Sequence, residues 1–143
     1  LWESEEVMIQ TINDIASKAD IVLPGTGEGK ILMGSEKPEE IAEFYRKNGA
    51  KAVIIKAGGD GAYADWEGGK GFYPGYKVEK VVDTVGAGDG FAVGILSAWL
   101  EGKEMPDMVD RGNAIGSIQV SVSSDNEGLP TREELDAYMK GAK

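Results

Sequence analysis

The stretch Asp83-Thr84-Val85-Gly86-Ala87-Gly88-Asp89 combines backbone and side-chain groups that together could carry chemistry. Two glycines in it let the chain bend sharply, so that backbone N–H groups can approach a ligand closely. The pattern predicts a short apolar strand at Val81-Val82 before the stretch and a helix that begins near Gly90-Phe91 after it. Unpaired N–H groups at a helix start lie at the positive end of the helix dipole and favour a bound anion.

Asp89 places a carboxylate beside this anion cradle. Transfer of a phosphoryl group to an alcohol needs both parts, because donors hold the phosphate charge while a carboxylate accepts the hydroxyl proton. The simpler alternative is a tight strand-to-helix turn, with Asp89 as a favourable first-turn charge. The chain contains no His and no Cys, which excludes imidazole bases, thiol nucleophiles and zinc-type sites and leaves carboxylates, lysines and hydroxyls.

The seven-residue string resembles the second signature of the ribokinase-like (PfkB) carbohydrate kinase family. The resemblance implies that Asp89 is the catalytic base and that the backbone of Gly86, Ala87 and Gly88 forms the anion hole for the transferred phosphate. It also suggests Asp83 as a ligand of a monovalent cation such as K⁺, which an acidic residue beside a phosphate would call for. A carboxylate that only caps the turn is the alternative for Asp83.

The composition sets the class of protein. A length of 143 residues and a hydrophobic share of 41% suit one folded domain, or part of one. The net charge of −10 disfavours binding to nucleic acid or to an anionic membrane. No apolar run approaches the ~20 residues that a membrane span needs, and no leader pattern is visible, so we expect a cytoplasmic protein. The first residue is Leu1, and the chain looks like the rear part of a longer one.

Apolar strands that alternate with amphipathic helices indicate an α/β fold. The pattern predicts a helix capped by Ser4, a strand at 21–23, a loop at 25–30, a helix from Pro38 to 48, a strand at 52–55, a hairpin over 58–73, a helix ending at Gly102, a helix from Pro106, and a last helix opened by a Thr131–Glu134 capping box. We expect a doubly wound, mostly parallel sheet with helices on both faces, the C-terminal part of a ribokinase-like fold.

The predicted loop Gly25-Thr26-Gly27-Glu28-Gly29-Lys30 is not a Walker A motif. That motif needs four residues between its first Gly and Gly-Lys, followed by Ser or Thr, whereas this loop has three and then Ile31. In the family that it resembles, an Asn-x-x-Glu motif follows this strand, and its Glu helps to place Mg²⁺ through water. Here Glu28 can take that role although the Asn is absent, and a merely solvated carboxylate is the alternative. The Leu-Pro-Gly-x-Gly-Glu form of residues 23–28 leans toward the branch of the family that acts on 2-keto-3-deoxygluconate.

Two further segments match the nucleotide-binding side of the family. Lys56, Gly58 and Gly61 match a Gly-x-x-Gly element that lies beside the nucleotide, with ordinary turn chemistry as the alternative. Asn113 lies where relatives line the adenine pocket, in a segment rich in small residues. Close helix packing is the expected role of the neighbouring glycines, whereas Asn113 is the polar exception.

Residues 1–143 are therefore expected to be the nucleotide-binding and catalytic C-terminal part of a kinase domain, with the N-terminal substrate and lid part absent. The resemblance implies ATP, Mg²⁺ and a small sugar acid as ligands; K⁺ and a homo-oligomer stay open. Alternatives are a kinase for 5-keto-2-deoxygluconate or fructose, an inactive nucleotide-binding module in the isolated chain, and a structural or interaction domain.

Overall fold

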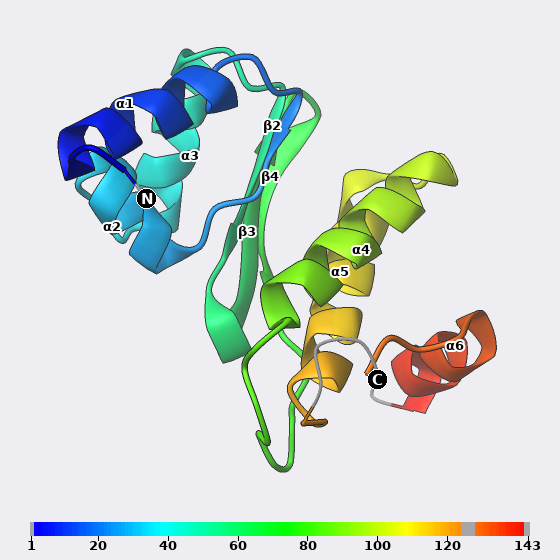
Figure 1. Cartoon of the computed structure of the whole chain (residues 1–143). Helices are drawn as coiled ribbons and strands as arrows, with labels where there is room; N and C mark the ends of the chain where they lie inside the picture. Colours follow the sequence, from blue (N-terminus) through cyan, green and yellow to red (C-terminus); the bar gives the residue numbers. More distant parts are fainter. Residues whose placement is uncertain (1, 124–127, 142–143) are drawn as a thin grey trace. The chain divides into compact units, whose positions relative to one another are not determined.

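The computed structural model describes residues 2–123 and 128–141, and confirms the α/β class (Figure 1). These residues form two compact units. The first comprises residues 2–57 and 63–72, and the second comprises residues 58–62, 73–123 and 128–141. Among the helices of the described residues, none has the length and apolar character needed to cross a membrane.

The first unit is built on a four-stranded sheet with the order β1-β2-β3-β4. Its strands are β1 (Ile21–Val22), β2 (Ala52–Lys56), β3 (Gly61–Trp66) and β4 (Gly69–Pro74), of which the last two extend into residues of the second unit. β1 and β2 are parallel, with Ile21 opposite Ala52. A short 3₁₀ turn, η1 (Gly58–Asp60), connects β2 to β3, and a tight turn connects β3 to β4. Connections this short join antiparallel neighbours. The sheet is therefore mixed, and the predicted hairpin is confirmed.

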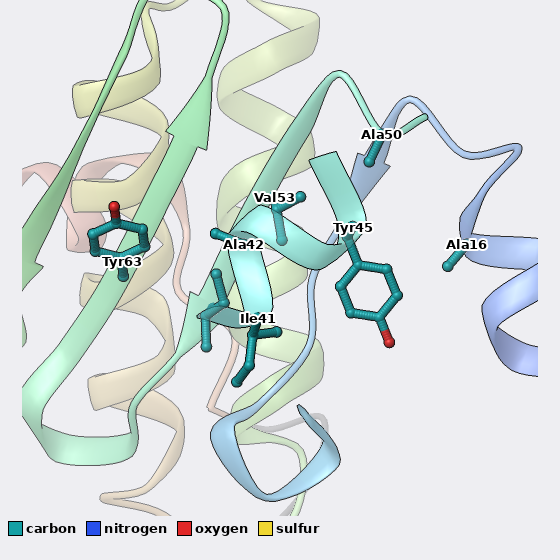
Figure 2. Packing of buried hydrophobic residues seen from close by; sticks show 8 residues of the cluster. Ala16, Ile41, Ala42, Tyr45, Ala50, Val53 and Tyr63 are labelled. Atoms are coloured by element: carbon teal, nitrogen blue, oxygen red, sulfur yellow. The ribbon is translucent and has the colours of Figure 1, made fainter. Parts of the chain in front are cut away.

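Three helices, α1 (Glu5–Ala16), α2 (Thr26–Met33) and α3 (Pro38–Lys47), complete the first unit. The core forms where α3 meets β2: Ile41, Ala42 and Tyr45 pack with Val53 (Figure 2). Every residue of β2 from Ala52 to Ile55 is buried, so both faces of this strand are covered. This buried strand fixes the position of Lys56 at its carboxyl end and of the turn that follows.

Two of the predicted helix starts in this unit are confirmed. The hydroxyl of Ser4 accepts a hydrogen bond from the amide of Val7 at 3.1 Å and so caps α1. Pro38 occupies the first position of α3, where its missing N–H costs nothing.

The predicted loop at 25–30 is wrong, because these residues begin helix α2. The carboxylate of Glu28 accepts a hydrogen bond from the amide of Gly25, the residue before the helix. This bond caps the helix start, where Gly25 stands in place of a capping Ser, Thr, Asp or Asn. Gly29 is buried within the helix, and a β-carbon there would collide with the Ile41 side chain. The glycines that suggest a loop in the sequence therefore allow close packing of a helix.

The second unit contains helices α4 (Ala87–Leu100), α5 (Met105–Gln119) and α6 (Arg132–Gly141), and α4 runs beside α5 (Figure 1). A β-carbon at Gly94 of α4 would stand 2.6 Å from the Cα of Gly112 on α5, so the two backbones touch. Gly116 lies further along α5, where a β-carbon would be 3.4 Å from the carbonyl oxygen of Ala87. Close helix packing, the role expected for these glycines, is confirmed.

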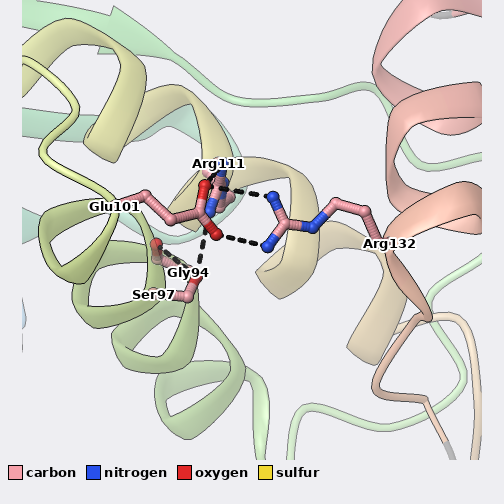
Figure 3. A network of polar contacts seen from close by, with 5 residues as sticks. All are labelled: Gly94, Ser97, Glu101, Arg111 and Arg132. Atoms are coloured by element: carbon pink, nitrogen blue, oxygen red, sulfur yellow. Dashed lines mark hydrogen bonds and ion pairs between the residues drawn. The ribbon is translucent and has the colours of Figure 1, made fainter.

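Helix α6 is fastened to the other two helices by an ion-pair network and a small core. Thr131 and Glu134 form the predicted capping box, with the Thr131 amide 2.7 Å from the carboxylate of Glu134. Glu101, just after α4, binds Arg111 of α5 at 2.9 Å and both terminal nitrogens of Arg132 on α6 (Figure 3). Leu135 of α6 packs with Ala114 and Ile115 of α5.

Two predictions next to the Asp83–Asp89 stretch need correction. Val81 and Val82 belong to no strand; the amides of Val82 and Asp83 instead donate to the carbonyl of Val120, at 2.8 and 3.3 Å. Both valines are exposed, so burial does not drive them into a sheet. The helix begins at Ala87 rather than near Gly90, because Gly86 turns the chain with a φ of 78° and accepts the first helical bond from Gly90.

Candidate active site

The first turn of α4 presents backbone donors as the Asp83–Asp89 stretch predicts. The left-handed Gly86 is the residue before the helix, and Ala87 and Gly88 are its first two positions. The amide of Ala87 donates to the carbonyl of Thr84 at 3.3 Å. Within the described residues, the amides of Gly86 and Gly88 make no hydrogen bond, so they stay available at the positive end of the helix.

Asp89 is the third residue of α4 and directly follows Gly88 in the first turn. Its side chain is exposed to solvent. No ion pair of Asp89 is found in the part of the chain that the structure describes. An exposed carboxylate without a cationic partner can accept a proton from a ligand that lies against the helix start.

Helix α5 fixes this turn from both sides. The carbonyl of Val120 holds the incoming chain at Val82 and Asp83, as described above. On the outgoing side, the absence of a side chain at Gly116 lets the backbone at Ala87 approach α5. The donors of the first turn are thus held by a neighbouring helix before any ligand arrives, which is the condition for stabilising a developing charge.

Asp83 makes a local contact. Its Oδ1 accepts a hydrogen bond from the amide of Val85 at 3.0 Å, which is the turn-capping geometry considered as the alternative. The half-buried carboxylate retains a second oxygen for another ligand. The cation role of Asp83 therefore stays a prediction.

The nucleotide candidates Gly58, Gly61 and Asn113 all belong to the second unit, and two of them meet at the end of β4. Both glycines have positive φ, 60° and 119°, and a β-carbon at Gly61 would collide with the carbonyl of Tyr73. Asn113 is 7% exposed, and its amide nitrogen donates to the carbonyls of Tyr73 and Pro74, each at 3.2 Å. Asn113 and Gly61 thus contact the same stretch of backbone.

Glu28 and Lys56 are brought together in the first unit. The ammonium of Lys56, at the end of β2, lies 3.9 Å from Oε2 of Glu28, the oxygen that also accepts the Gly25 amide. The amide of Lys56 donates to the carbonyl of Pro24 at 2.8 Å, which fixes the strand end beside the start of α2.

The donor set around Glu28 is compatible with Mg²⁺. No cluster of three or more acidic side chains that could hold a metal is found among the described residues. Mg²⁺ commonly keeps several waters and binds through one or two carboxylates and the phosphates of a substrate, so the exposed carboxylate of Glu28 would suffice on the protein side.

Sequence reasoning missed several groups that shape this region. The carbonyl of Val120 and the hydrogen bond from the Tyr76 hydroxyl to Asp110, at 2.9 Å, join residues more than 30 positions apart. A hydrophobic pattern carries no signal for such a pairing, whereas the glycine positions of α5 did indicate a close neighbour.

The model of the pfkB family of carbohydrate kinases matches residues 1–132. The 2-dehydro-3-deoxygluconokinase of Bacillus subtilis (strain 168) is 49% identical over 143 residues, which are 100% of this chain and 44% of that enzyme. The chain therefore spans less than half of the length of this curated relative.

Solved structures give the same fold. The crystal structure of a PfkB protein from Polaromonas sp. JS666 is 49% identical, with a TM-score of 0.84 over 96% of this chain and 42% of the other. A putative ribokinase II from E. coli, solved in complex with ATP and Mg²⁺, is 25% identical, with a TM-score of 0.85 over 94% of this chain and 43% of the other.

Proposed function

Since the chain belongs to the pfkB family of carbohydrate kinases, we propose that it forms the nucleotide-binding and catalytic part of an ATP-dependent kinase for a sugar acid. The observation that carries this proposal is the first turn of α4. There the amides of Gly86 and Gly88, which make no hydrogen bond within the described residues, precede the exposed carboxylate of Asp89. The E. coli relative with ATP and Mg²⁺ supports both ligands. The substrate and lid part would lie in a segment outside residues 1–143, and a cytoplasmic location is part of this proposal.

Asp89 is the general base of the proposed reaction. Its carboxylate accepts the proton of the acceptor hydroxyl while the hydroxyl oxygen forms a bond to the γ-phosphorus of ATP. The bond from that phosphorus to the bridging oxygen breaks, and ADP leaves with the electron pair. The amides of Gly86 and Gly88 hold the negative charge on the transferred group, and the turn that carries them is already fixed by α5.

The remaining candidates act on the nucleotide and its charge. Mg²⁺, when bound through water to Glu28, neutralises phosphate charge. Lys56 beside Glu28 contributes a second positive charge, and Gly58, Gly61 and Asn113 shape the place of the nucleotide base and sugar. Asp83 would hold K⁺ next to the anion hole, which offsets its own negative charge there.

We assign 2-keto-3-deoxygluconate (2-dehydro-3-deoxygluconate) as the acceptor, phosphorylated to its 6-phosphate. The identity of 49% to the Bacillus subtilis enzyme supports this assignment, as does the Leu-Pro-Gly-x-Gly-Glu form of residues 23–28. The second candidates are 5-keto-2-deoxygluconate and fructose, which the same phosphoryl-transfer groups would serve equally well.

A panel of acceptors tests the assignment. The complete gene product that carries this chain, called the full-length protein below, is assayed with MgATP by coupled detection of ADP. Turnover of 2-keto-3-deoxygluconate with the highest kcat/KM is expected, and a higher value for another sugar would overturn the choice of acceptor.

A second measurement separates the classes of function. The isolated chain is expected to be inactive but to bind Mg-ADP, which a thermal shift detects. Binding by the chain together with the absence of turnover of every sugar by the full-length protein would indicate a nucleotide-binding module. The absence of binding in both forms would indicate a structural or interaction domain. Size-exclusion chromatography of the full-length protein tests whether it is a homo-oligomer.

A further inference from the structure

The backbone from Tyr73 to Gly75 lies directly against the Gly58–Gly61 turn. The amide of Gly75 donates to the carbonyl of Asp60 at 2.9 Å, and a β-carbon at Gly75 would stand 2.5 Å from the carbonyl oxygen of Gly59. A β-carbon at Gly61 would in turn collide with the Tyr73 carbonyl. No side chain fits between the two segments, so a shift of one moves the other.

Two side chains on one face of α5 bind this segment, one through its backbone and one through the Tyr76 side chain. Asn113 donates to the carbonyls of Tyr73 and Pro74, and Asp110, three residues earlier in α5, accepts the hydroxyl of Tyr76 at 2.9 Å. Residues three apart in a helix lie on the same side of it. The segment 73–76 is therefore bound to α5 at Tyr73, Pro74 and Tyr76, and to the glycine turn through the amide of Gly75.

The ring of Tyr76 is packed against its neighbours in the second unit. Its ring packs against Tyr138 of α6 with centroids 5.4 Å apart, and both rings cover the cluster formed by Ala114, Ile115 and Leu135. Burial, and then the bond to Asp110, raise the pKa of Tyr76 above its ordinary value. The hydroxyl thus remains a donor over the whole range in which the protein would work.

We infer that Tyr76 is a positioning residue of the nucleotide site: its hydroxyl, held by Asp110, fixes residues 73–75 and through them the Gly58–Gly61 turn. The inference rests on the proposed function, in which that turn contacts the nucleotide. It assigns a role to a tyrosine and an aspartate that no glycine motif points to.

The matched pair Tyr76→Phe and Tyr138→Phe tests this inference. Each variant loses one hydroxyl from the same packed pair of rings, but the hydroxyl of Tyr138 bonds to Ser117 at 2.9 Å and not to residues 73–75. Both variants are made in the full-length protein. The dissociation constant of Mg-ADP, the KM values for ATP and for the acceptor, and the amide exchange rate of Gly75 are measured for each.

For Tyr76→Phe we expect the Mg-ADP dissociation constant, the KM for ATP and the exchange rate of the Gly75 amide to rise by about threefold to tenfold, the scale of one lost hydrogen bond. The KM for the acceptor stays unchanged, and Tyr138→Phe leaves all four quantities near their original values. Equal effects of the two variants, or unchanged nucleotide affinity in Tyr76→Phe, would overturn the inference while leaving the kinase proposal standing. An original protein that binds no Mg-ADP would overturn both.

Discussion

A β-carbon at Gly94 of α4 would stand only 2.6 Å from the Cα of Gly112 on α5. The two helices therefore approach each other to backbone contact at this point. Because α5 also holds the first turn of α4 through Gly116 and the incoming chain through Val120, this crossing sets the position of the candidate anion hole.

Gly94→Ala is expected to destabilise the protein, because the added methyl group has no room and the helices must separate. The expected loss is about 1–3 kcal/mol in the free energy of unfolding, the usual cost of overpacking. Urea unfolding measures it. Gly27→Ala is the matched control: Gly27 lies in α2, where nothing would meet the new β-carbon, and the same change should stabilise by up to about 1 kcal/mol. Equal urea midpoints for the two variants would refute the account of the crossing.

The network at Glu101 predicts a loss of stability in acid. Hydrogen bonds and charge attraction from Arg132 and Arg111 lower the pKa of Glu101 to about 2, below its ordinary value of 4.5. A pKa that is lower in the folded state means that the unfolded state binds more protons between the two values. The stabilisation is therefore complete above pH 4.5 and is lost as the pH falls toward 2.

Glu101→Gln removes this contribution, so the difference in Tm from the original protein should be large at about pH 6 and shrink by about pH 3. Glu36→Gln is the control, since Glu36 forms an exposed ion pair with Lys30 at 3.5 Å, and such pairs contribute little to stability. A Tm difference for Glu101→Gln that is the same at both pH values would contradict the role of the network.

Glu28→Gln tests the magnesium role and keeps the helix cap. The glutamine oxygen can still accept the amide of Gly25, but the negative charge near Lys56 is gone. The Mg²⁺ concentration for half-maximal rate should rise by about 10-fold to 100-fold, as for other residues that orient a metal through its ligands. Titration of Mg²⁺ in the kinase assay measures it, with Glu36→Gln as control. An unchanged titration curve would leave Glu28 as a cap only.

Asp83→Asn distinguishes a cation ligand from a turn cap. The asparagine oxygen preserves the bond from the Val85 amide, so the turn should remain, whereas the charge that attracts a cation is removed. If Asp83 holds K⁺, the original protein is activated by K⁺ relative to a tetramethylammonium salt at equal ionic strength, and the variant is not. Equal activation in both proteins would show that the carboxylate only caps the turn.

The sequence predicts much of this architecture because many of its signals are local. Ser4, Pro38 and the Thr131–Glu134 box mark helix starts through contacts within one turn, and the structure confirms them. The failures arise where distant residues decide. Gly25, Gly27 and Gly29 suggest a loop, but Gly29 packs against Ile41 inside a helix. Val81-Val82 suggests a strand, but the amides of Val82 and Asp83 donate to the carbonyl of Val120 and not to a neighbouring strand.

In the candidate site, too, the sequence predicts the local features and misses the contacts between distant residues. The Asp83–Asp89 string predicts the donors and the carboxylate at the start of α4, although the helix begins three residues earlier than expected. The pairing of Glu28 with Lys56, and of Asn113 with Tyr73 and Pro74, depends on the folded chain. The same holds for the bond between Tyr76 and Asp110, whose residues lie 34 positions apart.

The central claim is that Asp89 is the general base, and Asp89→Asn in the full-length protein tests it most directly. Asp107→Asn is the matched control, because Asp107 is an exposed carboxylate at the same position in the first turn of α5 and shares only the dipole effect. We predict that Asp89→Asn lowers kcat by about 10²-fold to 10⁴-fold while the dissociation constant of MgATP changes by less than about twofold. Asp107→Asn should leave both values near those of the original protein. A kcat for Asp89→Asn close to that of Asp107→Asn would contradict the claim.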